Sequence, residues 1–152
     1  MSTSLRSVAD ERARLHAHHA SSRPLSVDYE LVGLAGEVAF GERFGYAVDL
    51  TLRPGGDGRI DFEADGLTLD VKTARLAFNL LREQGKPHAD ILVLAEYFDE
   101  TEKARLVGWE WDYVMVQCPT KTFGYGVVNH YKHRSQLRSI SLLDEVFPRG
   151  DQ

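Results

Sequence analysis

The feature that most constrains the fold is a pair of alternating apolar and polar segments joined by Asp65-Gly66. Residues 60–63 and 67–72 each alternate between the two kinds of side chain, as strands with one buried face do. Asp-Gly between two such segments is typical of a two-residue β-hairpin loop. We therefore expect an antiparallel hairpin in which Ala64 pairs with Leu67, Glu63 with Thr68 and Phe62 with Leu69.

This register gathers charged residues on one face of the hairpin. Asp61 is expected opposite Asp70, and Lys72 points to the same side because strand side chains alternate. The other face holds four apolar residues, which are Ile60, Phe62, Leu69 and Val71. Directly opposed like charges destabilise a sheet by roughly 0.2–1 kcal/mol. Two interpretations follow: a solvated face on which Lys72 screens both carboxylates, or a site for Mg²⁺ or Mn²⁺, which prefer oxygen ligands.

The remaining segments predict an α/β order. Apolar spacing indicates a helix that Ser26 caps and that ends near Phe44-Gly45. We then expect a strand over 46–52, a turn over 54–58, the hairpin, a short and partly helical connection over 75–86, and a doubly buried strand over 91–95. The last part predicts an acidic turn over 96–102, strands over 106–111 and 113–117, and a small helix over 141–147.

The chain length of 152 residues suits one compact domain. We expect that domain over residues 25–152, after an N-terminal helix or mobile arm over residues 1–24. A hydrophobic content of 43% and a net charge of −5 exclude a wholly disordered chain. The single cysteine, Cys118, excludes an intramolecular disulfide and a Cys-rich zinc site. Without a long apolar run or a signal peptide, the chain is expected to be cytoplasmic and to bind no membrane.

Three motifs occur in a characteristic order. They are Gly36-Glu37-Val38-Ala39-Phe40, then the Gly-rich turn Gly56-Asp57-Gly58-Arg59-Ile60-Asp61-Phe62, then Leu69-Asp70-Val71-Lys72-Thr73. Over roughly residues 30–110, this set resembles the PD-(D/E)XK nuclease superfamily, which includes restriction endonucleases, Holliday-junction resolvases and small phage-type nucleases. The resemblance implies a restriction-endonuclease-like αβββαβ core with a mixed central sheet flanked by helices. It also implies a Mg²⁺-dependent DNA endonuclease in which Mn²⁺ can substitute, and the fold analogy allows a homodimer.

The resemblance implies a role for each matching residue. Asp61 corresponds to the first metal-binding acidic residue, although Ile60 stands where the name-giving proline would be. Asp70 corresponds to the second metal ligand, and Lys72 to the catalytic lysine that positions the attacking water. In similar enzymes the backbone carbonyl at the position of Val71 also contacts the metal.

Two acidic residues carry a second interpretation. Glu37 matches the acidic residue that many members of the superfamily supply from the first helix; the alternative is an ordinary exposed helix glutamate. Asp57 competes with Asp61 for the ligand role. We prefer Asp61 because its register faces Asp70, whereas Asp is common in Gly-flanked turns for conformational reasons.

Nucleic acid would be contacted by residues after the motif and near the C-terminus. Thr73 and Arg75 follow the Asp-Val-Lys motif, where a DNA phosphate is expected. The stretch from Tyr113 to Leu143 has no Asp or Glu and carries a charge of +4. We expect its basic residues to contact phosphates, and these are Lys121, Lys132, Arg134 and Arg138. The interleaved aromatic residues, which are Phe123, Tyr125 and Tyr131, can stack on bases or pack.

Alternative functions remain open at this point. The basic stretch can also be a solvated edge hairpin with a polar rim. The protein can be a catalytically silent relative that binds nucleic acid or a protein partner through the nuclease fold. A structural or regulatory subunit without nucleic acid is a third alternative, which the overall acidity allows.

Overall fold

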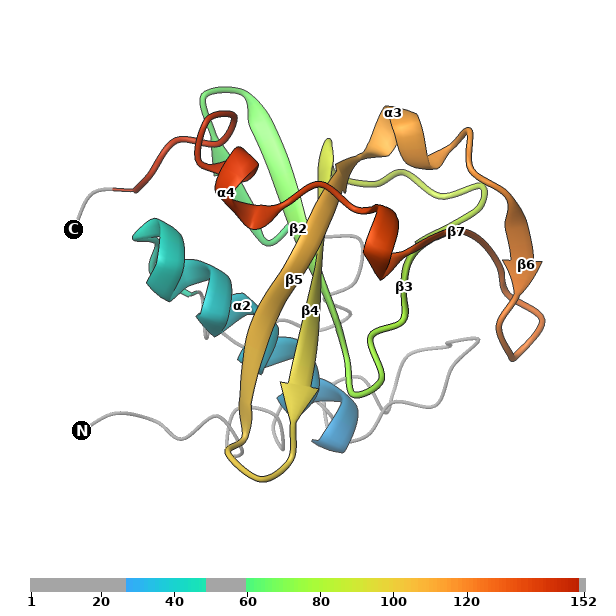
Figure 1. Ribbon diagram of the computed structural model, residues 1–152, viewed down its shortest axis with the longest axis horizontal. Helices are drawn as coiled ribbons and strands as arrows, with labels where there is room; N and C mark the ends of the chain where they lie inside the picture. The colour runs from blue at the N-terminus through green and yellow to red at the C-terminus, as the bar shows by residue number, and fades with distance from the viewer. Residues whose placement is uncertain (1–26, 49–59, 151–152) are drawn as a thin grey trace.

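The computed structural model describes residues 27–48 and 60–150 (Figure 1). The predicted N-terminal helix or arm, the Ser26 cap and the Gly-rich turn with Asp57 lie outside the described residues. The described part is a mixed α/β structure with one long helix and two sheets.

The long helix is α2 (Val27–Phe44). The four-stranded sheet has the order β1-β2-β4-β5, and its strands are β1 (Phe62–Ala64), β2 (Leu67–Ala74), β4 (Ile91–Phe98) and β5 (Lys103–Trp111). The three-stranded sheet has the order β3-β7-β6, with β3 (Asn79–Glu83), β6 (Thr120–Thr122) and β7 (Val128–His133). The short helices are α3 (Asp112–Met115), η1 (Arg134–Gln136) and α4 (Ile140–Leu143).

The β1–β2 hairpin has the predicted register. Phe62 pairs with Leu69, and Ala64 pairs with Leu67. Asp65 and Gly66 both have positive φ, at 51° and 80°, which is the backbone that a two-residue type I′ turn requires. The Asp-Gly sequence and the alternation of side chains therefore determine this pairing locally.

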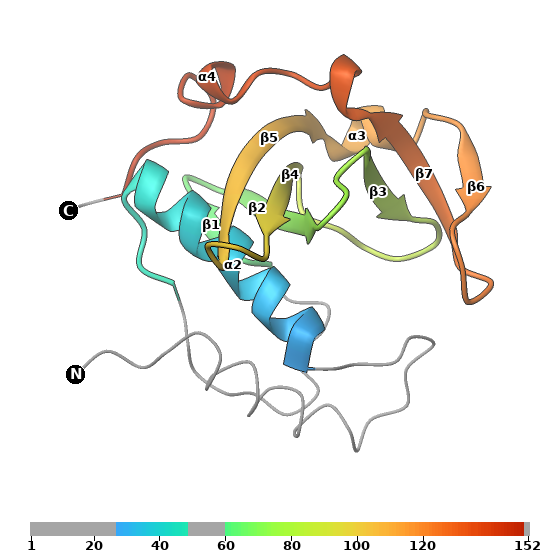
Figure 2. The same cartoon turned by 60° about the horizontal axis from the view of Figure 1, so that its bottom comes forward.

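The four-stranded sheet is mixed, because β2 runs antiparallel to β1 but parallel to β4, and β5 runs antiparallel to β4. The predicted doubly buried strand is confirmed, since Ile91 to Ala95 are all buried in β4. In Figure 2, α2 lies along one side of this sheet and the second sheet lies beyond the other.

The two faces of the four-stranded sheet carry separate cores. On one face, α2 and the C-terminal segment pack on β2, β4 and β5, and the cluster includes Phe40, Phe44, Phe62 and Phe147. The rings of Phe40 and Phe44 stack with centroids 4.5 Å apart. On the other face, β3 and α3 pack on β4, through Leu80 and Met115 among others. Side chains of β2 that alternate with the first core therefore face the β3 side.

Two segments differ in type from the prediction. The connection over 75–86 is not helical; it contains β3, whose ladder partner is β7. That partner lies about fifty residues further along the chain, so no local pattern reveals it. Tyr113 does not start a strand over 113–117, because it lies in α3, which buries Met115. One helical turn is too short for its period to be distinguished from alternation.

Smaller differences concern element boundaries. Ile60 was expected on the core face, but β1 begins only at Phe62 and Ile60 is 38% exposed. Residues 46–48 form no strand, and the rest of the expected strand over 46–52 is outside the described residues. Within the expected acidic turn over 96–102, the first three residues extend β4. The predicted C-terminal helix over 141–147 is confirmed over residues 141–143 only, since α4 spans Ile140–Leu143.

Candidate active site

Asp61 and Asp70 are held against each other by two backbone hydrogen bonds. The Asp61 N–H donates to Oδ1 of Asp70 at 3.0 Å, and the Val71 N–H donates to Oδ2 of Asp61 at 2.8 Å. Each carboxylate therefore accepts a hydrogen bond from a backbone N–H of the segment that carries the other carboxylate. The structure brings together the two acidic residues that the hairpin register predicted, at the point where β1 begins beside β2.

Burial and neighbouring charge both act on this pair. Burial raises the pKa of Asp61 well above its usual value of 3.8, and the carboxylates of Glu37 and Asp70 raise it further. Burial also raises the pKa of Asp70, although the Lys72 ammonium and the Asp61 N–H oppose that shift. Carboxylates crowded in a partly desolvated place create the field that a bound cation relieves.

Lys72 and Glu37 complete the cluster. Nζ of Lys72 lies 3.8 Å from Oδ2 of Asp70, and 41% of the lysine side chain is exposed. Asp70 and Lys72 alternate with Leu69 and Val71, which belong to the α2 core, so they lie on the opposite face of β2. Glu37 comes from α2 and acts on Asp61 through its charge, so it is part of the electrostatic environment of the pair.

His88 is a neighbour that the sequence did not indicate. Its charge influences the pKa of Asp70, and the Lys72 ammonium in turn influences His88. Its Nε2 lies 2.9 Å from the carbonyl oxygen of Glu83, and burial lowers its pKa. No motif marks this histidine, because the loop before β4 brings it near the site from about 16 residues further along the chain.

The donor set fits a hard cation of the Mg²⁺ type. Among the described residues no three His, Cys, Asp or Glu side chains form a group that could enclose a metal ion. Mg²⁺, however, is commonly bound through one or two carboxylates while it keeps several waters. The hydrogen bonds between the strands use one oxygen of each carboxylate. This leaves the second oxygen of Asp61 for a ligand role, while the second oxygen of Asp70 lies 3.8 Å from the Lys72 ammonium.

Thr73 and Arg75 are not placed for a phosphate contact in this structure. Thr73 lies on the face of β2 opposite Asp70 and Lys72, and Arg75 is held by ion pairs. The hydroxyl of Thr73 is buried under α2, with no hydrogen-bond partner among the described residues. Arg75 binds Asp28 of α2 through Nη1 at 2.7 Å and Asp99 of the β4–β5 turn through Nε at 2.7 Å. In this structure Arg75 connects two elements of the fold.

Two of the predicted phosphate-binding residues converge on one buried carboxylate. Glu110 of β5 is 1% exposed, and it pairs with Nζ of Lys132 at 2.5 Å and with Nε of Arg138 at 2.6 Å. Arg134 pairs with Glu96 at 3.3 Å. These three cations are therefore engaged within the protein, whereas Lys121 is exposed and lies 5.7 Å from the ring of Phe123.

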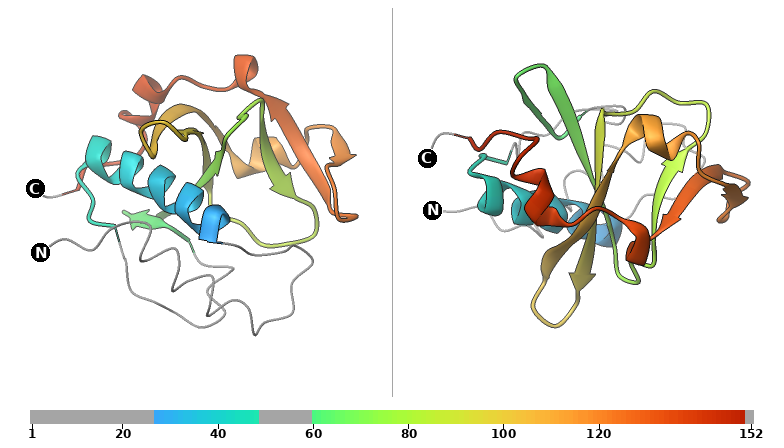
Figure 3. Two further views of the ribbon diagram at one scale, coloured as in Figure 1. Left: turned by 90° about the horizontal axis from the view of Figure 1, so that it is seen from below. Right: turned by 45° about the horizontal axis from the view of Figure 1, so that its top comes forward.

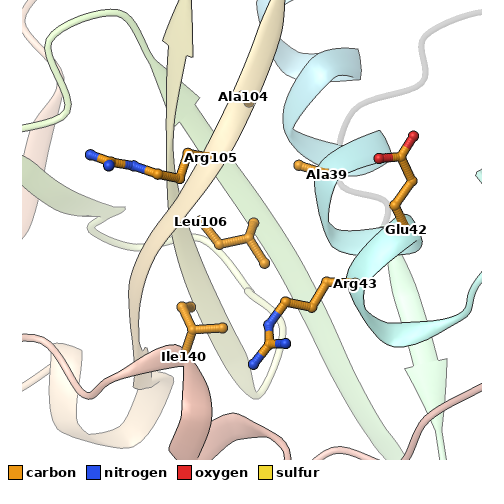
Figure 4. A pocket seen from close by; sticks show the side chains of 7 residues that line it. All are labelled: Ala39, Glu42, Arg43, Ala104, Arg105, Leu106 and Ile140. Atoms are coloured by element: carbon orange, nitrogen blue, oxygen red, sulfur yellow. The ribbon is translucent and has the colours of Figure 1, made fainter.

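A shallow groove lies elsewhere on the molecule, between α2 and β5 (Figure 4). In Figure 4 the side chains of Arg43, Leu106 and Ile140 lie toward one another across it. None of its lining residues belongs to the Asp61–Asp70 cluster. The cluster is thus separate from this groove.

Comparisons with known proteins add no relative. No protein-family model, no curated protein and no solved structure matches this chain. The helices of the described residues include none with the length and apolar character needed to cross a membrane. The geometry of the site is therefore what bears on the function of this protein.

Proposed function

We propose that the protein is a metal-dependent endonuclease that hydrolyses phosphodiester bonds in DNA, with a restriction-endonuclease-like core. The observation that carries the proposal is the interlocked pair of Asp61 and Asp70 with the Lys72 ammonium 3.8 Å from Asp70. Two carboxylates kept together at an electrostatic cost need a reason, and a divalent cation provides one.

Each residue has a defined role in this proposal. Asp61 and Asp70 would hold the cation, with the Val71 carbonyl as a further oxygen ligand and Glu37 adding negative charge. When bound, Mg²⁺ or Mn²⁺ supplies neutralisation of the phosphate and a lowered pKa for the attacking water. Lys72, with its exposed ammonium, would orient that water and stabilise the negative charge that develops on the phosphate.

The test is a cleavage assay with matched lysine variants. Purified protein is incubated with supercoiled plasmid and with duplex, single-stranded and branched DNA, in Mg²⁺, in Mn²⁺ and in EDTA. We expect cleavage that EDTA abolishes, and a loss of about 100-fold or more in Lys72→Ala and Asp70→Asn. Lys103→Ala, an exposed lysine at the start of β5, should cleave like the wild type.

The outcome that rejects the proposal is equally specific. If the wild type cleaves no better than Lys72→Ala on every substrate, the protein is not a nuclease. DNA retention in Ca²⁺ would then favour the catalytically silent relative, and its absence would favour a subunit without nucleic acid.

A further inference from the structure

The β6–β7 hairpin projects from the far edge of the second sheet (Figures 1 and 3). Its edge strand β6 is exposed along its whole length, and Thr120 pairs with His130 at its base. The loop between the strands is closed by a hydrogen bond from the Val127 N–H to the Gly124 carbonyl at 3.0 Å. The hairpin therefore presents a defined tip to solvent.

Tyr125 occupies that tip in an unfavourable backbone conformation. Its φ is +51°, between Gly124 at +126° and Gly126 at +71°, a region that costs a non-glycine residue on the order of 1 kcal/mol or more. Its side chain is 69% exposed, so packing in the core does not offset this cost. The ring is therefore accessible to a partner outside the chain.

Two other aromatic residues of the hairpin, Phe123 and Tyr131, pack against each other next to the tip. Phe123 packs edge-on against Tyr131, with ring centroids 5.7 Å apart, and Nζ of Lys121 lies 5.7 Å from the Phe123 centroid. These contacts hold Phe123, which is 40% exposed, and leave Tyr125 as the more exposed ring at 69%.

The charge of the hairpin favours an anionic partner. The stretch from Tyr113 to Leu143 contains no acidic residue. Three of its four cations are engaged by Glu110 and Glu96. Within the described part of the chain, no carboxylate lies at ion-pair distance from Lys121, which keeps this ammonium available beside the aromatic tip.

We infer that the tip of the β6–β7 hairpin binds unpaired nucleotides of single-stranded DNA. Tyr125 stacks on an exposed base, and Lys121 contacts an adjacent phosphate. An unpaired strand is preferred because the faces of bases within a duplex are covered by their neighbours, whereas every unpaired base offers a face for an aromatic ring.

This inference deepens the proposed nuclease function and rests on it for the choice of DNA. The second sheet packs through β3 on the face of the four-stranded sheet that carries Asp70 and Lys72. Lys72 and the second sheet, which carries the hairpin, are therefore on the same side of the four-stranded sheet.

The test measures binding without cleavage. Fluorescence anisotropy of a labelled single-stranded oligonucleotide is recorded with the full chain in EDTA. We expect the Kd to rise about five- to hundredfold in Tyr125→Ala, to rise in Lys121→Ala, and to stay near the wild-type value in Tyr125→Phe. Tyr113→Ala, which removes an exposed tyrosine of the same acid-free stretch outside the hairpin, is the matched control.

Folding and function are separated by two further measurements. Tyr125→Asn introduces a residue that tolerates positive φ. If this variant binds single strands more weakly but has an unchanged melting temperature, the loss of affinity is assigned to the missing tyrosine ring. Equal binding by the wild type and Tyr125→Ala, equal losses in Tyr125→Ala and Tyr113→Ala, or no binding of single strands by the wild type would each overturn the inference. If Lys72→Ala abolishes cleavage while Tyr125→Ala binds normally, the hairpin site is rejected and the proposed nuclease function stands. If the wild type binds single strands through Tyr125 but does not cleave DNA, the hairpin site stands and the nuclease function is rejected.

Discussion

The buried carboxylate of Glu110 binds two of the basic residues that the sequence predicts as phosphate contacts. Lys132 and Arg138 both bind it, and the N–H of Trp111 donates to it at 2.9 Å. Burial alone would raise the pKa of Glu110, but these donors outweigh that effect and leave it below its usual value of 4.5. Two residues that the sequence offers as phosphate contacts therefore stabilise the joint between β5, β7 and the segment before α4.

We expect Glu110→Ala to lower the free energy of unfolding by about 3 kcal/mol, because it leaves two cations beside the core without their carboxylate. Urea denaturation at pH 7 measures the change. Glu145→Ala, at an exposed glutamate, should stay within about 0.5 kcal/mol of the wild type.

The ion pairs of Glu110 also predict how the stability of the protein changes with pH. Because folding lowers the pKa of Glu110, its contribution is complete above the usual value and declines as the pH falls through the lower folded-state value. The stability difference between the wild type and Glu110→Ala should shrink in acid. A difference that grows in acid would contradict the assignment.

The packing of α2 on β2 depends on the absence of a side chain at Gly36. A Cβ at this position would lie 1.8 Å from Oγ1 of Thr73, whereas a Cβ at Gly33 would meet nothing within 4 Å. The two glycines are in the same helix, one turn apart. Gly36 thus sets the distance at which the helix carrying Glu37 lies over the strand carrying Asp70.

The two glycines predict opposite effects of the same substitution. Gly36→Ala should destabilise the protein by about 1–3 kcal/mol through overpacking, and Gly33→Ala should stabilise it by up to about 1 kcal/mol through helix propensity. Thermal unfolding of both variants compares them directly. Adding Thr73→Ala to Gly36→Ala should recover part of the loss, and equal destabilisation by both glycine substitutions would refute the close approach.

For the whole molecule, the placement of charge matters more than the net value of −5. The acid-free stretch carries +4 and the remainder carries −9. Ion pairs to Glu110 and Glu96 engage three of those four cations. Of the four cations in this stretch, only Lys121 is consequently without an ion pair to a carboxylate of the described residues.

A shallow salt dependence of DNA binding follows from this distribution. Each phosphate contact contributes about 0.7 to the slope of log K against log salt for a single strand, so contacts by Lys121 of the acid-free stretch and by Lys72 predict a magnitude below about 2. Anisotropy titrations across a range of NaCl concentrations measure it. A slope of about 3 or steeper would mean that Lys132, Arg134 and Arg138 leave their carboxylates when DNA binds.

The parts of the fold that local physics specifies were predictable. The register of β1 and β2 follows from a two-residue Asp-Gly turn, and the apolar period of α2 and the continuous apolar run of β4 are each contained in one segment. The pairing of Asp61 with Asp70 follows from that register, because only nine residues separate them. The predictions for residues 75–86 and 113–117 were wrong, because β3 is stabilised by a remote strand and α3 by one buried methionine.

The sequence alone therefore determines the β1–β2 hairpin and its pair of carboxylates, because side-chain alternation and turn geometry act over a few residues. The effect of the Glu37 charge on Asp61, the approach of His88 and the ion pairs of Lys132 and Arg138 depend on contacts between segments far apart along the chain. Those contacts exist only after the helix and both sheets have packed, because a buried carboxylate selects its partners by distance in space and not by sequence.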